Sequence, residues 1–350
     1  MDFELKSRIK NSKFTIALLS AVFLAVALLA QVGEVSAQQP IDIKITTIQL
    51  RQQQMGIGVD RLAKYAQERL KGKVRIRTYP AAQLYSGREE LQAVMKGEVQ
   101  MAYIIGSILE QVDPSVELIK LPYLFSNSDH MYRVLEGPVG KKLFAKADQK
   151  GVSVVGMVSS GDVAIHNSKH PLKTVDDFKG LKLRSYGPMG AACIKALGSI
   201  AVVSVPEEMY SNFQTGILDG GANPATVFMA RKLYDVQKYV TQGGMLNAAI
   251  VFLIANKSWW HGLPQDIKTG LSESIQRLVK EQRAEMEAEN KILFQQIASK
   301  GCEVHYLTPT EQTGWKQALQ VVYTEYAPKL DPEMLKELVR EAERVGKAKN

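Results

Sequence analysis

Two stretches of the chain decide its predicted architecture: ELQAVMKGEVQMAY, residues Glu90–Tyr103, and MYSNFQTGILDGGAN, residues Met209–Asn223. Each begins with a helical pattern, passes through a glycine suited to a left-handed helix end, and enters a short buried strand. Each is preceded by a strand that ends at a proline, Pro80 or Pro206. Two α/β lobes built on one plan are the economical explanation, although helix–glycine–strand units are common enough to recur by coincidence.

The segments on either side predict further alternation of strands and helices. A strand is predicted at Ile41–Leu50, a helix at Gly58–Leu70 and a second strand at Lys73–Pro80, which together indicate an α/β fold with a largely parallel sheet. A helix predicted from about Asp266 to Ala298 would be about 45 Å long, enough to lie across two lobes. No low-complexity linker interrupts the chain, so crossing strands rather than a tether are expected to join the lobes.

The first 37 residues form a predicted secretory signal peptide that is removed by cleavage. Four basic side chains between Lys6 and Lys13 precede an uncharged apolar run, Thr15–Ala30, and a small-residue cleavage site, Val35–Ala37. A retained membrane anchor is the alternative, because the apolar run approaches the length needed to span a bilayer. No cysteine directly follows the run, so a lipid anchor is not expected. The sequence therefore predicts an exported protein.

The composition is that of a soluble globular protein, with 45% hydrophobic and 23% charged residues. The net charge is +8, and it becomes +7 without residues 1–37, which carry four basic and three acidic side chains. The basic residues are scattered, so nucleic acid is not an expected partner, whereas a positive field could attract small anions. Cys193 and Cys302 could form a disulfide in an oxidising compartment, but two buried thiols are the favoured interpretation.

Sequence motifs for catalysis, cofactors and metals are absent. Two of the five histidines, His166 and His170, are four residues apart, but their segment, HNSKHP, is typical of a loop rather than of a metal-binding helix. No phosphate-binding loop, dinucleotide-binding glycine pattern or G-x-S-x-G motif occurs. Cys193 lies in a predicted helix, where packing is the commoner role. We therefore predict no catalytic residue, no cofactor and no metal site.

The strongest candidate for binding chemistry is Arg184, in the segment LKLRSY. A period of two places Arg184 and Tyr186 on the opposite strand face from Leu183. Arg184 is near the carboxyl end of the strand, where ligands bind in open α/β sheets, and the N-terminus of a helix predicted at Met189–Leu197 faces the same crevice. A guanidinium in this place is suited to holding a carboxylate through two hydrogen bonds. The alternative is an ion pair with an acidic neighbour, for example Asp176 or Asp177.

A second polar candidate is Asn223, in the segment LDGGANP. Asn223 follows a predicted buried strand and two glycines, and Pro224 restrains the backbone after it. Its side-chain amide could complete the grip on a carboxylate. A turn-forming asparagine before proline is the alternative interpretation.

Together these segments resemble the substrate-binding proteins of tripartite ATP-independent periplasmic (TRAP) transporters, the DctP family. The elements GLKLR and Q-T-G-x-x-D-G-x-x-N-P are specific when they occur together, and the matching segments follow one another over nearly all of the mature chain. The segments are YPAAQL (Tyr79–Leu84), LPYLF (Leu121–Phe125), DDFKGLKLR (Asp176–Arg184), MYSNFQTGILDGGANP (Met209–Pro224) and LYDVQKYV (Leu233–Val240).

The resemblance implies a two-lobed periplasmic binding protein fold with a hinge, crossing strands and a long interlobe helix. It implies lobe I at residues 38–160 and about 249–288, and lobe II with the C-terminal helices at 161–248 and about 289–350. The cleft between the lobes would close on a small organic acid anion and deliver it to the membrane subunits of a TRAP transporter. The protein would then be periplasmic and not an enzyme.

The resemblance also implies roles for two residues. Arg184 corresponds to the arginine that holds the ligand carboxylate, and Asn223 corresponds to the asparagine that assists it. Many members carry a second arginine at a place where this chain has Val163 and Ala164. This departure leaves Arg184 as the principal charged anchor.

Other departures make the predicted cleft lining more apolar than that of a sugar-acid binder. Ile48 follows the first strand, Ile105 ends the strand that begins at Met101, and Tyr85 replaces a common glycine. The complete set of predicted ligand contacts is Arg184, Asn223, Tyr186, Ile105, Ile48, Tyr85 and Arg88.

The expected ligand is therefore a carboxylate with an apolar or aromatic remainder, because burying an unpaired hydroxyl costs about 1–3 kcal/mol. A C4-dicarboxylate is the alternative, if Arg88, Lys182 or another base pairs with a second carboxylate. A sensor protein that presents its ligand to a membrane receptor would have the same cleft. A secreted enzyme would need a nucleophile or an acid–base pair near Arg184, and none is evident.

Overall fold

A computed structural model of the chain describes residues 39–185, 187–204, 208–243 and 249–347. The predicted signal peptide lies outside these residues. The chain divides into two compact units, Met1–Ile41 and Asp42–Asn350, and the account below concerns the second. None of the helices described is both long enough and apolar enough to cross a membrane.

The first of two sheets has five strands, and its helices follow from the glycine pattern. Strand β1 pairs in parallel with β3, whereas β10 runs antiparallel to both β3 and β4. Helix α3 (Gly87–Lys96) ends at Gly97 with a positive φ of 77°, as predicted, while helix α2 (Gln54–Leu70) begins four residues before the predicted start. The strand order is β2 (Val74–Tyr79), β1 (Ile41–Thr46), β3 (Met101–Ile105), β10 (Ile250–Asn256) and β4 (Val152–Ser159).

The second sheet has six strands and carries the arginine-containing segment. Strand β6 is parallel to both of its neighbours, β7 and β8, and β9 is parallel to β11, but β5 runs antiparallel to β8 and β9. The order is β11 (Glu303–Tyr306), β9 (Tyr239–Gln242), β5 (Val163–Asn167), β8 (Gly220–Pro224), β6 (Lys182–Ser185) and β7 (Ile200–Val203). Both sheets are therefore mixed rather than largely parallel, because a strand that arrives from the other sheet needs no parallel crossover.

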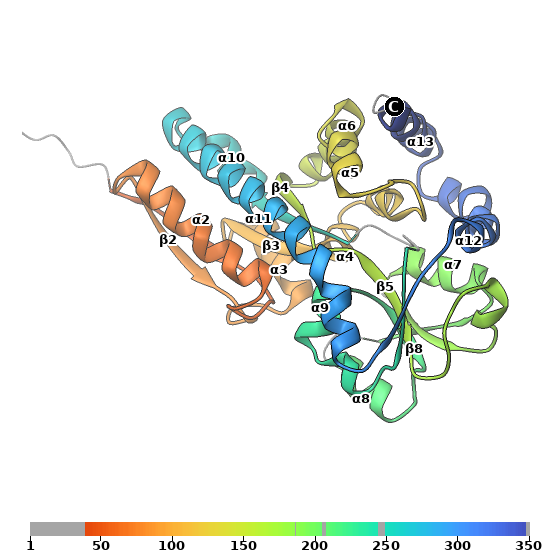
Figure 1. Cartoon of the computed structure of the whole chain (residues 1–350). Helices are drawn as coiled ribbons and strands as arrows, with labels where there is room; N and C mark the ends of the chain where they lie inside the picture. The colour runs from red at the N-terminus through yellow and green to blue at the C-terminus, as the bar shows by residue number, and fades with distance from the viewer. Residues whose placement is uncertain (1–38, 186, 205–207, 244–248, 348–350) are drawn as a thin grey trace, which may run out of the picture. The chain divides into compact units, whose positions relative to one another are not determined.

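The predicted crossing strands and long helix are present. Strand β4 of the first sheet continues into β5 of the second through residues 160–162, and the chain returns from β9 to β10. Helix α11 (Gln265–Ser299) has 35 residues, which makes it about 52 Å long. It contacts α2 and β4 at one end and α9 (Ala225–Ala230) and β11 at the other (Figure 1).

The core of the described residues includes a larger and a smaller apolar cluster that both contact the second sheet. The larger one includes Phe252 of the first sheet and Leu183 of the second, so a single core reaches both sheets. The smaller one lies on the other face of the second sheet and includes Phe213 and Phe228. Both cysteines are buried and no disulfide joins them, as favoured from the sequence.

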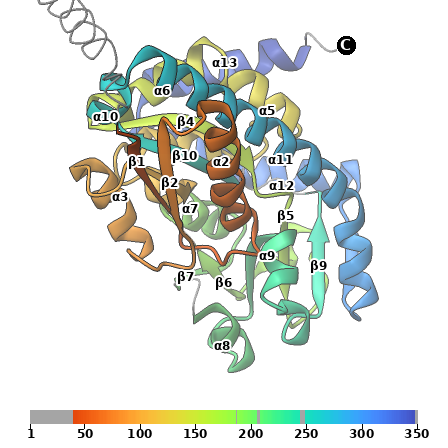
Figure 2. The same ribbon diagram turned by 90° about the vertical axis from the view of Figure 1, so that its left-hand side faces the viewer.

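The remaining helices cover the sheets. Helix α13 packs on α5 and α6, which follow the first sheet's strands in the sequence (Figure 2). From the sequence, α13 was predicted to belong to lobe II. The predicted boundaries of the two lobes stay a prediction. The helices not yet given bounds are α4 (Gly106–Leu109), α5 (Ser128–Leu135), α6 (Pro138–Gln149), α7 (Pro188–Ala196), α8 (Met209–Gln214), α10 (Lys257–Gly262), α12 (Pro309–Val321) and α13 (Pro332–Lys347). Short 3-10 helices include η1 (Pro114–Lys120) and η2 (Val175–Phe178).

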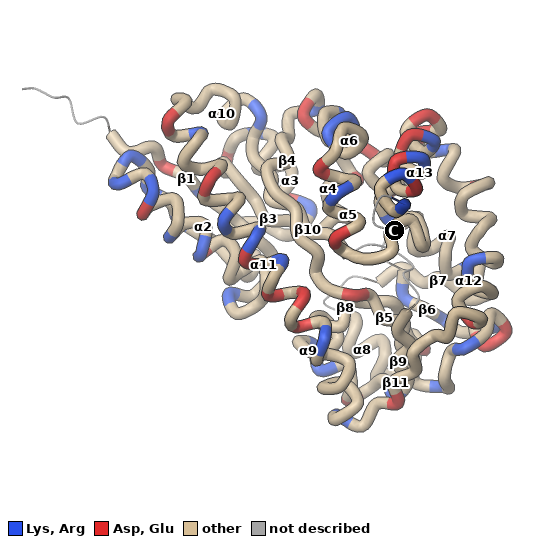
Figure 3. The backbone as a smooth tube through the Cα atoms, turned by 45° about the horizontal axis from the view of Figure 1, so that its top comes forward, with Lys and Arg blue, Asp and Glu red and all other residues tan. Residues whose placement is uncertain are grey.

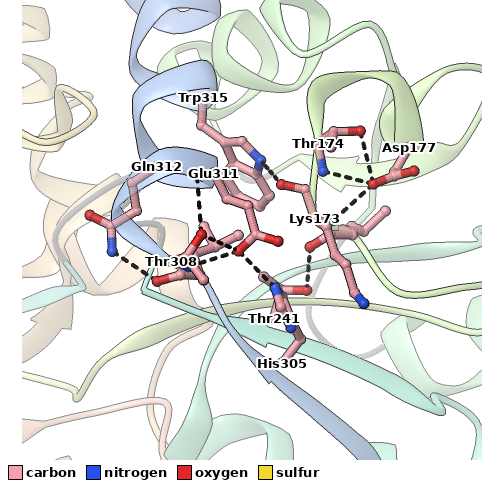
Figure 4. Close-up of polar contacts among 11 residues, drawn as sticks. Lys173, Thr174, Asp177, Thr241, His305, Thr308, Glu311, Gln312 and Trp315 are labelled. Carbon is pink, nitrogen blue, oxygen red and sulfur yellow. Dashed lines mark hydrogen bonds and ion pairs between the residues drawn. The ribbon is translucent and has the colours of Figure 1, made fainter.

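Polar contacts fix the start of α12 on the second sheet (Figure 4). Thr308 and Glu311 form a capping box, and Glu311 also lies 3.0 Å from Nε2 of His305 in β11. The indole Nε1–H of Trp315 donates to the carbonyl of Lys173 at 3.0 Å. These contacts join the C-terminal helices to the segment that leads into β6.

Charges of both signs alternate along the exposed helices (Figure 3). Ion pairs link α2 to α11, with 2.6 Å between Arg61 and Glu285 and 2.5 Å between Arg69 and Glu273. Exposed pairs of this kind contribute about 0–1 kcal/mol each, so they align the two helices more than they stabilise the fold.

Candidate functional site

The centre of the candidate site is a row of three residues across the second sheet. Arg184 of β6 is the register partner of Gly221 of β8, and Gly221 is the partner of His166 of β5. A Cβ atom at Gly221 would lie 3.0 Å from Cβ of Arg184 and 3.5 Å from the ring of Phe213. The missing side chain at Gly221 therefore leaves room for the arginine and the histidine on either side of it.

Arg184 occupies the strand face that the sequence predicted. Leu183 belongs to the larger apolar cluster, whereas Arg184 projects from the opposite face of β6 and is only 4% exposed. Its Nε–H donates to the carbonyl of Ser204 at 3.0 Å. A guanidinium buried to this degree needs several oxygen acceptors, which makes it a strong site for an anion.

The two acids given as examples of a partner for Arg184, Asp176 and Asp177, are engaged elsewhere. Asp176 pairs with Lys179 at 2.8 Å. Asp177 accepts hydrogen bonds from the backbone N–H groups of Thr174 and Lys173, which hold the pKa of this carboxyl below its usual value despite partial burial. Both acids therefore serve the η2 turn rather than the arginine.

Asn223 lies within strand β8, which corrects the prediction that it follows the strand. The strand consists of Gly220–Pro224, and Asn223 is the register partner of Ala164 in β5. Its side chain is 4% exposed and lies on the same face as the row of Arg184, Gly221 and His166, since it is two residues beyond Gly221. Its amide lies 2.9 Å from Nε2 of His166.

His166 connects Asn223 to the interior of the second sheet. The imidazole is fully buried between the rings of Phe213 and Phe228, at centroid distances of 5.3 and 5.1 Å. Its Nδ1 lies 2.9 Å from the side-chain amide of Gln237. Burial lowers the pKa of His166, the hydrogen bonds with Gln237 and Asn223 oppose this shift, and the positive charge of Arg184 adds to it.

His166, Gly221 and Gln237 also belong to this site and were not predicted. His166 was predicted to lie in a loop, but it is part of strand β5, and the alternation in VAIHN places it on the same strand face as Ala164. That alternation was the available signal for the histidine. No comparable sequence signal marks Gly221 or Gln237, because their roles depend on contacts with strands that are distant in the sequence.

The N-terminus of α7 does not add to this site as predicted. The backbone N–H of Met189 donates to Glu117 of η1 at 3.1 Å, and the hydroxyl of Tyr326 donates to the same carboxylate oxygen at 2.8 Å. Met189 belongs to the larger apolar cluster, on the face of β6 opposite Arg184. An internal carboxylate therefore occupies the positive end of this helix.

The other predicted contacts are more dispersed. Ile48 and Ile105 are both half-buried and follow or end the paired strands β1 and β3, at the carboxyl edge of the first sheet. Tyr85 donates its hydroxyl to Glu98 at 3.1 Å, and Arg88 is exposed on α3. Tyr186 lies outside the described residues.

A cavity of about 240 Å³ lies elsewhere, where α2, α9 and α11 meet. Glutamine and glutamate side chains dominate its wall, and none of the predicted ligand contacts lines it. Its lining residues are Gln49, Gln52, Gln53, Gln54, Ile57, Ser160, Thr226, Val227, Ala230, Gln282, Glu285, Met286 and Glu289.

Comparison with known proteins places the chain in a family. The sequence pattern of DctP, described as bacterial extracellular solute-binding protein, family 7, matches residues 46–329. The chain belongs to this family. It is 31% identical over 326 residues to the C4-dicarboxylate-binding periplasmic protein DctP of Rhodobacter capsulatus. This alignment covers 91% of this chain and 96% of the relative.

Solved structures agree with this assignment. A TRAP periplasmic solute-binding protein from Sulfurospirillum deleyianum with bound succinate is 28% identical, with a TM-score of 0.76, and covers 85% of this chain and 98% of that one. One from Ochrobactrum anthropi, with its C-terminus bound in the ligand-binding pocket, is 24% identical, with a TM-score of 0.82, over 89% of this chain and 97% of that one. The two-lobed fold predicted from the sequence is confirmed, and members of the family are periplasmic transport proteins rather than enzymes.

Proposed function

We propose that this protein captures a small organic acid by holding the ligand carboxylate at Arg184. The observation that carries the proposal is the buried guanidinium in the second sheet, close to Asn223 and His166. A guanidinium offers a carboxylate two parallel charge-assisted hydrogen bonds. Asn223 would then contact the same end of the ligand.

The rest of the ligand is proposed to be apolar or aromatic. At the place where the family resemblance led us to expect a second arginine, Val163 joins the apolar core and Ala164 lies directly opposite Asn223. Ile48 and Ile105 present half-buried apolar side chains at the carboxyl edge of the first sheet. A single guanidinium beside apolar walls favours a monocarboxylate, because a second carboxylate without a partner would lose its hydration.

A C4-dicarboxylate is the second candidate ligand. The Rhodobacter capsulatus relative is named for C4-dicarboxylate binding, and the Sulfurospirillum deleyianum structure contains succinate. Exposed Arg88 or Lys182 would have to supply the second cation. This candidate differs from the first in the charge required at the far end of the ligand.

The transport step is proposed to follow the family pattern. The signal peptide would direct the protein to the periplasm, where closure of the two lobes about the crossing segments traps the ligand. A ligand that binds the closed form more tightly shifts the population toward that form. The closed form would deliver its ligand to TRAP membrane subunits, and presentation to a membrane receptor would use the same closure.

A thermal-shift screen of organic acids tests the proposal. We expect stabilisation by 3-phenylpropionate or related monocarboxylates, little effect of galacturonate, and no stabilisation in Arg184→Ala. Stabilisation by succinate alone would favour the dicarboxylate candidate, and a response confined to sugar acids would contradict the apolar remainder. An unchanged response in the folded Arg184→Ala variant would contradict the carboxylate anchor. Ligand turnover, followed by NMR, would instead indicate an enzyme.

A further inference from the structure

The contacts of His166 require one of its two amide partners to point in a definite direction. Nδ1 and Nε2 of the ring lie 2.9 Å from Gln237 Oε1 and Asn223 Oδ1 respectively. A neutral imidazole has one N–H group, so it can donate to only one of these oxygens. The other amide must present its NH₂ group, which a half-turn of the amide achieves without any change of shape.

This environment favours the neutral form of the imidazole, because burial lowers the pKa of His166. The ring is fully buried, both neighbouring rings are apolar, and the cation of Arg184 further lowers the pKa of the imidazole. The groups that face the ring are Gln237 and Asn223, both uncharged. An imidazolium beside the arginine would be disfavoured both by burial and by repulsion.

A backbone carbonyl decides which amide turns. Nε2 of Gln237 lies 3.0 Å from the carbonyl oxygen of Val236, which can only accept a hydrogen bond. The NH₂ group of Gln237 must therefore face Val236, which leaves its Oε1 to accept from Nδ1–H of His166. Nε2 of His166 then has a lone pair and accepts from the NH₂ group of Asn223.

We infer that His166 is a positioning residue that turns the carbonyl oxygen of Asn223 away from the ring. The inference rests on the proposed function, in which this side of Asn223 faces the bound ligand. Asn223 then accepts a hydrogen bond beside the ligand carboxylate instead of donating one to it. The matching ligand has a hydrogen-bond donor on the carbon next to its carboxylate, and a 2-hydroxy acid with an apolar remainder has this chemistry.

The opposite direction of these hydrogen bonds would bring two acceptor oxygens together. If Nε2–H of His166 donated to Asn223, Nδ1 would need a donor, and Gln237 would turn its oxygen toward the carbonyl of Val236 at 3.0 Å. Two acceptors at this distance repel each other, and each would lose a partner in a buried place.

The tautomer of His166 can be measured without any ligand. In protein labelled with ¹⁵N-histidine, we expect a protonated Nδ1 and an unprotonated Nε2 at neutral pH. The signal is assigned by its loss in His166→Gln or, if that variant does not fold, by replacing the other four histidines one at a time. An Nε2–H tautomer or an imidazolium would overturn the inference.

Gln237→Met tests the direction imposed by Val236. Methionine is similar in size and removes the acceptor for Nδ1–H, so we expect the ring to switch to the Nε2–H tautomer and Asn223 to turn its NH₂ group outward. An unchanged Nδ1–H tautomer would contradict the role of Gln237. This readout reports hydrogen-bond direction, which a packing role alone would not alter.

Matched ligands test the consequence for binding. The probes are 3-phenyllactate against 3-phenylpropionate and malate against succinate, each pair differing by one 2-hydroxyl group. We expect the wild-type protein to prefer the hydroxylated member by about five- to tenfold, and Gln237→Met to lose this preference. Equal affinity for both members in the wild type would overturn the inference and leave the proposed function intact. Absence of Arg184-dependent binding to all four acids would count against the proposed function, while the tautomer measurement still decides the inference.

Discussion

Two fully buried titratable side chains, His166 in the second sheet and Glu90 beside the first, differ in how completely they are hydrogen-bonded. Both ring nitrogens of His166 have an amide partner. Glu90 of α3 accepts a hydrogen bond from the hydroxyl of Thr46 at one oxygen, at 3.1 Å, while its other oxygen has no partner among the described residues. The same degree of burial therefore surrounds a complete network in one sheet and an incomplete one in the other.

This difference teaches what burial does to a polar group. Burial favours the neutral form of both side chains, lowering the pKa of His166 and raising that of Glu90 to about 8. For His166, we propose that the neutral ring sets the direction of the hydrogen bonds that lead to the proposed ligand site. For Glu90, one carboxyl oxygen stays without a hydrogen-bond partner among the described residues, which destabilises the fold.

The largest expected effect is the loss of ligand binding in Arg184→Ala. Removing the guanidinium leaves the ligand carboxylate without its charged partner, so we expect at least about a 100-fold loss of affinity by isothermal titration calorimetry. Arg184→Lys is the matched control and should bind with intermediate affinity, because an ammonium group lacks the planar pair of donors. Equal affinity in all three proteins would remove the second sheet from the ligand site.

The next effect is a pH-dependent gain of stability in Glu90→Gln. The folded protein keeps the Glu90 proton up to about pH 8, whereas the unfolded chain releases it near pH 4.5, so this residue lowers stability as the pH rises through that window. The slope is at most about 1.4 kcal/mol per pH unit. We expect chemical denaturation to show a larger advantage of the variant at pH 8 than at pH 5. A constant difference across this range would show that Glu90 does not titrate there.

Gly221→Ala should weaken both folding and binding. The added methyl group would lie 3.0 Å from Cβ of Arg184, so the arginine or the strand must shift. We expect a cost of about 1–3 kcal/mol in unfolding free energy and a lower affinity for the carboxylate. Gly216→Ala is the control for loss of a glycine elsewhere, since its positive φ of 73° strains alanine without crowding the site. Wild-type affinity in Gly221→Ala would show that a side chain is tolerated between Arg184 and His166.

The smallest effect is expected for Thr46→Val. Valine keeps the shape of threonine but removes the hydroxyl that donates to Glu90, at a cost of about 1 kcal/mol in unfolding free energy. Combining it with Glu90→Gln in a double-mutant cycle measures the coupling between the two residues. Strict additivity would mean that the hydroxyl stabilises the buried acid no more than it stabilises the amide that replaces it.

Periodicity and the positions of glycines were sufficient to predict several features of the fold. The alternation of LKLRS placed Arg184 opposite Leu183, and Gly97 and Gly216 both have the positive φ expected of helix ends. The length of the Asp266–Ala298 pattern predicted a helix that contacts both sheets, and α11 does so. These features depend on neighbours within a few residues, which is why one sequence was sufficient to predict them.

Only the tertiary structure decided which distant residues meet. His166 reaches Asn223 because β5 and β8 pair antiparallel in one register, and a shift of one residue would turn each side chain to the other face. Glu117 occupies the start of α7, 72 residues further along the chain, and α13 packs on α5 and α6. Strand register and helix docking are set by the packing of segments far apart in sequence, so the periodicity of each segment alone could not specify them.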